Sequence, residues 1–298
     1  MQLSGRGVAM SFFASCVFAI IPGYALYLAP LNGIQVFAQR VLWSLPVVFV
    51  LLVLVGRLPQ LKVCLQRLVR EPILILAVFV SSALMGVQWL LFVWAPLNEH
   101  MLDLTLGYFL MPLSLVLAGR LFYNEHLRRL QRIAVVFAVL GMLHELWDVG
   151  GLSWVTLVCA LGYPPYFMLR RWMGFDAFSG FLLEMLVLSP IAIYLIVSFA
   201  PPQVFSVAPQ LWYLLPVLGL LSALAFGAML GASHLLPLGL LGILSYVEPV
   251  LLFVFSVFWI GEAVESGQWI TYIPIWLAVI LVIFDSLRVL LKQSRRLN

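Results

Sequence analysis

The chain has 298 residues, of which 64% are apolar and only 9% are charged. Soluble domains carry roughly 25% charged residues. This chain has too few charged residues to cover a surface that faces water, so it is expected in a lipid bilayer. Its net charge of +4 does not predict nucleic-acid binding, because the basic residues form no single patch. Its three cysteines are widely spaced and predict neither a disulfide framework nor a metal site.

Spanning helices need about 20 mainly apolar residues. The sequence predicts ten, at 7–29, 33–55, 72–96, 102–122, 129–147, 152–170, 177–198, 210–232, 238–260 and 267–290. The expected fold class is therefore all-α and transmembrane. The longest connector, 56–71, carries four basic residues and predicts an amphipathic surface segment. The apolar run after Arg6 is too long for a signal peptide and is expected to remain as the first span.

The basic residues predict the orientation of these spans. With the N-terminus inside, 15 of the 16 Lys and Arg residues fall on the inner side, and no external loop holds one. The sixteenth, Arg40, lies within a span. Positive charge gathers on the cytoplasmic side of membrane proteins, so we expect both termini in the cytoplasm and an even number of spans.

One stretch of the first half returns 137 residues later. Residues 112–131 and 249–268 share the spacing P-x12-E-x5-Q, with Glu125 and Glu262 as the acids. We expect both acids to be structural and to stabilise helix N-termini. A repeat at half the chain length predicts two copies of one unit. Five spans per copy invert the second, which gives inverted repeats at 1–149 and 150–298 around a central cavity, the pattern of secondary transporters.

Prolines in roughly matching places predict broken helices near a binding site. They are Pro22 in the first span and Pro164 in the sixth. The second span of the first half also corresponds to the second span of the other half at an offset of 144, which sets Arg40 against Glu184.

Charges inside spans are candidate functional residues. Arg40 is either functional, or it extends outward to the interface or bonds carbonyls at a helix break. Glu184 is its equivalent in the repeat, not necessarily its contact, and is either functional or caps a neighbouring helix. Glu248 lies near the middle of the ninth span beside Pro249, which removes a backbone donor. It either exchanges a proton or holds a cationic group, or it is a neutral acid that bonds a neighbouring helix.

Aromatic and amide side chains are expected to line the cavity with these charges, although Trp and Tyr near span ends also form interfacial belts. Apolar walls with a few polar groups suit a small amphipathic molecule. The candidates are Tyr24, Gln88, Trp89, Tyr108, Tyr163, Tyr166 and Tyr246.

The chain resembles the RarD-like branch of the EamA-type drug/metabolite transporters. The resemblance rests on QRVLWS at 39–44, LGYF with the following proline at 106–112, EHLRRLQ at 125–131, GFLLEMLVLSP at 180–190, LGILSYVEP at 241–249 and IW at 275–276. It implies an inner-membrane permease with two five-helix repeats around a central cavity.

Several positions depart from that branch. Gln35 and Gln39 stand where it tends to have an acid and a histidine, and Met111 replaces an asparagine. Ser245 replaces a glutamine, and Glu248 replaces a small residue. These departures predict a re-lined cavity, so the substrate of the branch is not carried over.

Three classes of function remain open. The first is a secondary transporter that moves a small amphipathic metabolite or drug by alternating access, with protons as a candidate coupling ion, no cofactor and no nucleic-acid partner. The second is an intramembrane enzyme acting on a lipid or headgroup, although no HExxH motif, acidic cluster or Walker motif is present. The third is a sensor or assembly module that does not transport. We expect a transporter and not an enzyme.

Overall fold

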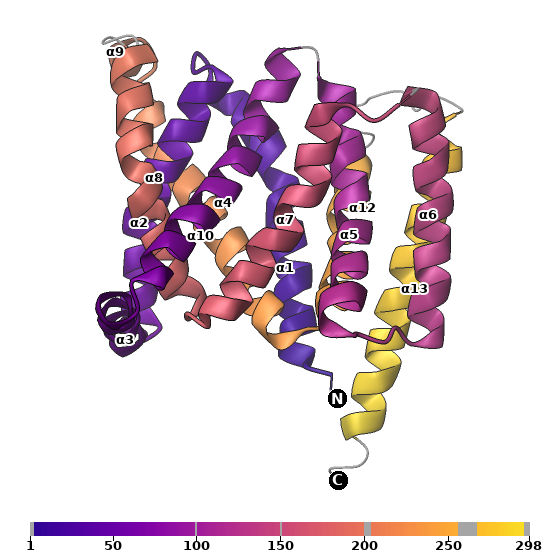
Figure 1. Cartoon of the computed structure of the whole chain (residues 1–298). Helices are drawn as coiled ribbons and strands as arrows, with labels where there is room; N and C mark the ends of the chain where they lie inside the picture. Colours follow the sequence, from indigo (N-terminus) through magenta and orange to yellow (C-terminus); the bar gives the residue numbers. More distant parts are fainter. Residues whose placement is uncertain (1–2, 99, 150, 200–203, 256–266, 295–298) are drawn as a thin grey trace.

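The computed structural model describes residues 3–98, 100–149, 151–199, 204–255 and 267–294, and within them all regular structure is helical (Figure 1). The helices are α1 (Gly5–Ala25), η1 (Leu26–Leu28), α2 (Gly33–Leu54), α3 (Leu58–Arg70), α4 (Ile73–Leu97), α5 (Met101–Tyr123), α6 (Arg129–Val149), α7 (Trp154–Met173), α8 (Ala177–Phe199), α9 (Val204–Val207), α10 (Leu211–Leu235), α11 (Leu238–Ser245), α12 (Val247–Phe255) and α13 (Gln268–Ser294).

Eight of the described helices are long and apolar enough to cross a membrane: α1, α2, α4, α5, α6, α8, α10 and α13. The predicted sixth span is α7, which contains two prolines and carries Arg170 and Arg171 in its last turn. The predicted ninth span is divided between α11 and α12. The chain is therefore a multi-pass membrane protein, and the count of ten crossings stays a prediction.

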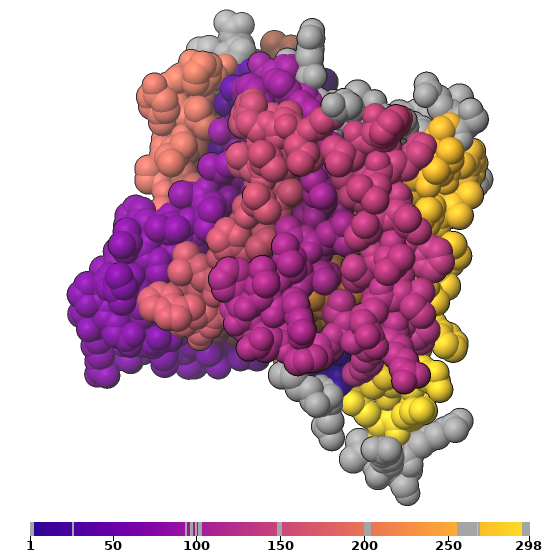
Figure 2. All heavy atoms as spheres, turned by 45° about the vertical axis from the view of Figure 1, so that its right-hand side comes forward, coloured from indigo at the N-terminus to yellow at the C-terminus, as the bar shows by residue number. Residues whose placement is uncertain are grey.

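The long helices run side by side, and the start of α1 and the end of α13 lie at the same end of the bundle (Figure 1). At that end α3 forms the helix that the basic connector predicted, with Cys64 as its one buried residue. Helix α1 packs against α10, α2 against α8 and α10, and α5 against α7 and α11. Helices α6 and α13 pair at one edge of the molecule (Figure 2).

The prediction that prolines break the first and sixth spans was wrong. Helix α1 continues through Pro22 to Ala25, and α7 continues through Pro164. A proline leaves the carbonyl four residues earlier without its helical donor, and neighbouring hydroxyl groups can satisfy it. In α7 that carbonyl belongs to Ala160, and the Ser114 hydroxyl of α5 donates to it at 2.5 Å.

Glu125, which follows the end of α5, links that helix end to the start of α11. Its carboxylate accepts hydrogen bonds from the backbone amides of Leu238 at 2.7 Å and Gly239 at 2.8 Å, which begin α11. Arg171, near the end of α7, lies 3.5 Å from the same carboxylate. Glu125 therefore stabilises a helix N-terminus as expected, but the helix is α11, more than 100 residues away in the chain, and not α6, which follows it.

The glutamine of the motif has a similar double role. The Gln131 side chain accepts from the Arg128 amide at 3.0 Å, at the start of α6. It donates to Asp285 of α13 at 3.1 Å. The polar residues of the first motif copy thus join the first half of the chain to the second. Glu262, the acid of the second copy, lies outside the described residues.

We predict that Glu125→Ala lowers the stability of the protein by about 2–4 kcal/mol, because it leaves two helix-end amides and Arg171 without their charged acceptor. The measurement is the thermal unfolding midpoint in detergent. Glu71→Ala is the matched control, since its ion pair with Arg67 has half-exposed side chains and is expected to contribute less than about 1 kcal/mol. Equal losses in both variants would contradict a specific role for Glu125.

Candidate functional site

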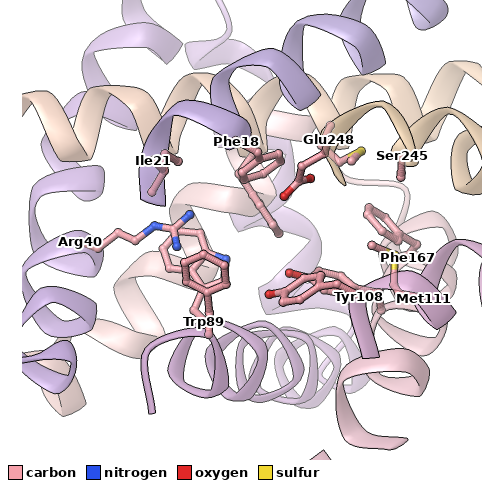
Figure 3. A pocket seen from close by; sticks show the side chains of 13 residues that line it. Phe18, Ile21, Arg40, Trp89, Tyr108, Met111, Phe167, Ser245 and Glu248 are labelled. Carbon is pink, nitrogen blue, oxygen red and sulfur yellow. The ribbon is translucent and has the colours of Figure 1, made fainter. Parts of the chain in front are cut away.

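A cavity lies where eight helices meet (Figure 3). Its volume is about 50 Å³, which is room for a few water molecules. Pockets for small molecules enclose roughly 300–1,000 Å³, so these walls must separate before a larger molecule enters. The lining residues are Phe18, Ile21, Arg40, Trp89, Phe92, Tyr108, Met111, Tyr163, Phe167, Phe226, Met229, Ser245 and Glu248.

Arg40 is held at the cavity by contacts from two other helices. Its Nε donates to the Ser222 hydroxyl of α10 at 2.8 Å, and its guanidinium carbon lies 4.0 Å from the centre of the Trp89 ring of α4. The side chain is buried, with 6% of its surface exposed, so it does not extend to the interface. A serine and an aromatic ring partly compensate for the lost hydration of the charge.

Glu248 reaches the cavity because the predicted ninth span is interrupted. Pro249 cannot donate to the Ser245 carbonyl, and α11 ends at Ser245 while α12 begins at Val247. Glu248 lies in the first turn of α12, where the helix dipole favours a carboxylate. Figure 3 places its carboxylate and the Arg40 guanidinium in the same cavity, both directed inward.

Aromatic rings form most of the remaining wall. Trp89 contacts Phe226 edge-on at 5.5 Å between ring centres, and Tyr108 contacts Phe92 in the same way at 5.9 Å. These arrangements are favourable for aromatic pairs and fix the rings against one another. The wall is therefore largely apolar, with charge confined to Arg40 and Glu248.

The structure brings five of the ten predicted cavity residues together in this one site. They come from five different helices and are separated in the chain by up to about 200 positions. They are Arg40, Trp89, Tyr108, Tyr163 and Glu248.

Three other predicted residues tie helices together outside the cavity lining. The Tyr24 hydroxyl donates to the Leu214 carbonyl at 2.8 Å, and the Tyr246 hydroxyl donates to the Phe109 carbonyl at 2.8 Å. Gln88 donates to the Val158 carbonyl of α7 at 2.7 Å. In each case a polar group inside the bundle is occupied by the backbone of a neighbouring helix, as burial requires.

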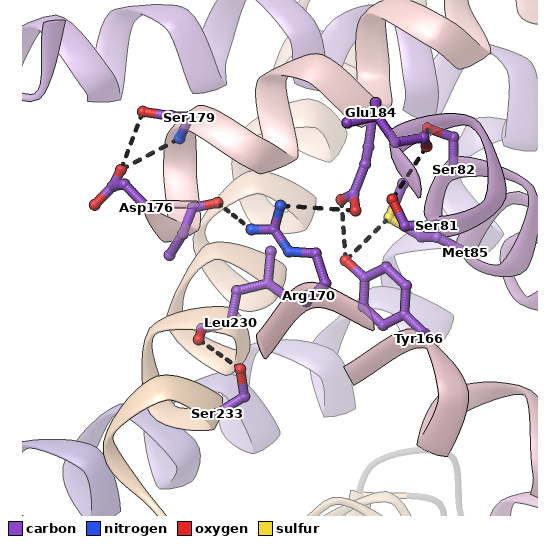
Figure 4. A network of polar contacts seen from close by, with 12 residues as sticks. Ser81, Ser82, Met85, Tyr166, Arg170, Asp176, Ser179, Glu184, Leu230 and Ser233 are labelled. Carbon is purple, nitrogen blue, oxygen red and sulfur yellow. Dashed lines mark hydrogen bonds and ion pairs between the residues drawn. The ribbon is translucent and has the colours of Figure 1, made fainter. Parts of the chain in front are cut away.

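The remaining two, Glu184 and Tyr166, belong to a separate buried network (Figure 4). Glu184 lies 3.7 Å from Arg170, and both side chains are almost fully buried, at 1% and 0% exposure. The Tyr166 hydroxyl donates to the same carboxylate at 3.0 Å. Gly180 makes room for this pair, because a Cβ atom there would collide with the Arg170 guanidinium. Glu184 therefore pairs with Arg170 of a neighbouring helix, and a role of Glu184 in substrate binding stays a prediction.

A second, larger cavity of about 570 Å³ opens beside α3. Its lining includes Arg6, Arg57, Arg67, Asp176 and His234, and Arg57 pairs with Asp176 at 3.6 Å. Sequence reasoning placed these basic residues on the inner side but did not predict a cavity among them.

The chain is 54% identical to the chloramphenicol-sensitive protein RarD of Pseudomonas aeruginosa, over 99% of both chains. It is 30% identical to protein RarD of Escherichia coli, over 97% of this chain and 98% of that one. The chain belongs to the RarD family.

An uncharacterized transporter of Haemophilus influenzae is 36% identical over 94% of both chains. The names of these RarD relatives and the apolar helices together identify a membrane transporter, which points away from an enzyme. A solved crystal structure matches with a TM-score of 0.69 and 17% identity, over 95% of this chain and 98% of that one, and likeness at this identity establishes the fold alone. No family model matches the chain.

Three of the positions that depart from the RarD-like pattern, Met111, Ser245 and Glu248, line the central cavity. The other two do not: Gln35 donates to the Phe199 carbonyl, and Gln39 accepts from Trp43. The cavity residues that sequence reasoning missed altogether are apolar, and nothing distinguishes them from the rest of an apolar chain. They are Phe18, Ile21, Phe92, Phe167, Phe226 and Met229.

We predict that Arg170→Met destabilises the protein by about 3–5 kcal/mol, because it leaves Glu184 charged, buried and unpaired. The double variant Arg170→Met/Glu184→Met is expected to recover most of that loss, since a buried ion pair is often replaceable by apolar side chains. Thermal unfolding midpoints in detergent measure both. A double variant as unstable as the single one would show that the pair itself stabilises the fold.

Proposed function

We propose that this chain is a secondary transporter of the inner membrane that moves a small amphipathic metabolite or drug by alternating access. The observation that carries the proposal is the central cavity, where an aromatic wall surrounds Arg40 and Glu248 at the interruption between α11 and α12. Transporters place their sites at such interruptions, where irregular backbone borders a cavity. The name of the Pseudomonas relative refers to chloramphenicol sensitivity, and we do not assign that compound to this chain.

Repeat-related positions in the cavity support two inverted halves, 1–149 and 150–298. At the 137-residue offset of the sequence repeat, Tyr108 corresponds to Ser245 and Met111 to Glu248, and all four line the cavity. The two halves thus contribute equivalent helix positions to one site, as expected when a substrate site lies on the axis between repeats.

Helix packing gives a second line of support. In the proposed repeat, α7 is the counterpart of α1, and α10 is the counterpart of α4. Helix α1 packs on α10, and correspondingly α7 packs on α4. Helix α2 packs on α10, and correspondingly α8 packs on α4. Because these pairs join one half to the other, movement of one half against the other would open the cavity to alternate sides.

The orientation supplies a test of the ten-span arrangement. We predict that both termini and α3 are cytoplasmic, because 15 of the 16 basic residues fall on that side. Topology reporters inserted at 148–150 and 203–206 are expected to report the external side, with a C-terminal fusion as the cytoplasmic control. A cytoplasmic signal at both insertions would reject the arrangement.

We further predict that Glu248→Gln leaves the protein inserted and folded but removes the pH dependence of transport, because the amide cannot exchange a proton. Flux in reconstituted vesicles, at one acidic and one alkaline pH, measures this. The other ionisable groups that line the cavity, Arg40, Tyr108 and Tyr163, remain in the variant. Glu71→Gln, on an exposed carboxyl outside the cavity, is the control. Transport by Glu248→Gln that keeps the wild-type pH dependence would reject Glu248 as the proton-exchanging group.

A further inference from the structure

The central cavity contains two opposite charges that the protein does not pair with each other. Arg40 and Glu248 both line it, and their charged groups point inward. Among the described residues, no ion pair joins them. A charge that is removed from water without a partner is strongly unfavourable, so this arrangement needs an explanation.

The Arg40 guanidinium is held in place, but not all of its N–H groups have an acceptor. Its Nε is used by Ser222, and the Trp89 ring lies against its carbon. In the part of the chain that the structure describes, no protein group accepts from its two terminal nitrogens. Those nitrogens form a planar fork that matches the two oxygens of a carboxylate or phosphate.

The Glu248 carboxylate likewise lacks a hydrogen-bond donor from the described protein. No described side chain or backbone amide donates to it, although α12 places it at the cavity edge. The adjoining Ser245 hydroxyl donates to the Leu241 carbonyl within its own helix instead. The natural partner for a carboxylate in this position is a cationic group that enters the cavity.

Other buried charges of the described bundle have partners within the protein. Arg170 pairs with Glu184, both almost fully buried, and the buried Asp285 pairs with Arg128, whose side chain is 36% exposed. The fold therefore pairs these buried charges, whereas in the described part of the chain Arg40 and Glu248 line the central cavity without an ion pair.

We propose that the transported molecule is a zwitterion with an apolar body: its anionic group binds Arg40, its cationic group binds Glu248, and the aromatic wall contacts what lies between. This rests on the proposed transport function and narrows its substrate class. A purely cationic molecule leaves Arg40 uncompensated, and a purely anionic one leaves Glu248 uncompensated. Only a molecule that carries both charges compensates both residues at once.

The test compares dipolar probes with their singly charged halves. One series is 4-(aminomethyl)benzoate with benzylamine and benzoate, and the other is L-phenylalanine with phenethylamine and 3-phenylpropionate. Binding is measured as the ligand-induced rise in thermal unfolding midpoint of the purified full-length protein. In at least one series the dipolar probe is expected to bind about tenfold more tightly than either half.

Two variants separate the contributions of the charges. Arg40→Gln is expected to remove the advantage of the dipolar probe over the amine, and Glu248→Gln its advantage over the acid. If a single variant is too unstable to purify, Arg40→Gln/Glu248→Gln leaves no unpaired charge and is expected to lose the dipolar preference entirely. Glu71→Gln is the surface control and is expected to behave as wild type.

Binding of an amine or an acid as tight as that of its dipolar partner in both series would overturn the zwitterion assignment, and so would a lack of binding by every probe. Vesicle flux of the tightest probe tests transport separately. A dipolar probe that binds through Arg40 and Glu248 but does not cross the membrane would reject the transport function and leave the ligand class intact.

Discussion

The hydrogen bonds between the Glu125 carboxylate and the first amides of α11 show the constraint on which this structure depends: a charge removed from water must be compensated by another part of the chain. Because the sequence has so few charged residues, each such contact links particular helix ends. Glu125 joins the end of α5 to α11, and Arg171 adds α7 to the same point. Because the helices are apolar on nearly all faces, these polar joints determine which helix ends meet.

The same constraint accounts for the helix-to-helix contacts of residues that look functional in the sequence. Glu184 pairs with Arg170 and accepts a hydrogen bond from Tyr166, and Gln88 donates to a carbonyl of α7. Their placement depends on small residues: Gly162 leaves room for Gln88, and Gly180 leaves room for Arg170. A charged residue within a span is therefore a strong functional candidate only when no residue of a neighbouring helix pairs with it.

By that standard the central cavity is the exception in the described bundle. Arg40 and Glu248 are held in place without being paired with each other, and the interruption before Pro249 keeps the carboxylate beside the opening. Two charges without partners destabilise the folded protein. A ligand that compensates both charges removes this destabilisation, and the recovered free energy strengthens its binding. The small volume of the cavity is consistent with a conformation in which the walls have closed around little more than water.

The sequence alone determined the membrane class, the positions of the long helices, the grouping of basic residues at one end and the resemblance to the RarD-like branch, because hydropathy, charge placement and motif spacing are local properties of the chain. The resemblance also drew attention to Met111, Ser245 and Glu248, which the structure places in the cavity lining. The sequence could not determine that Pro22 and Pro164 leave their helices intact, since that depends on contacts such as the Ser114 hydroxyl from another helix. Nor could it decide that Glu184 meets Arg170 while Arg40 shares a cavity with Glu248, because the partner of a charge is set by which helices pack together, and an apolar pattern that is nearly uniform around each helix does not encode that choice.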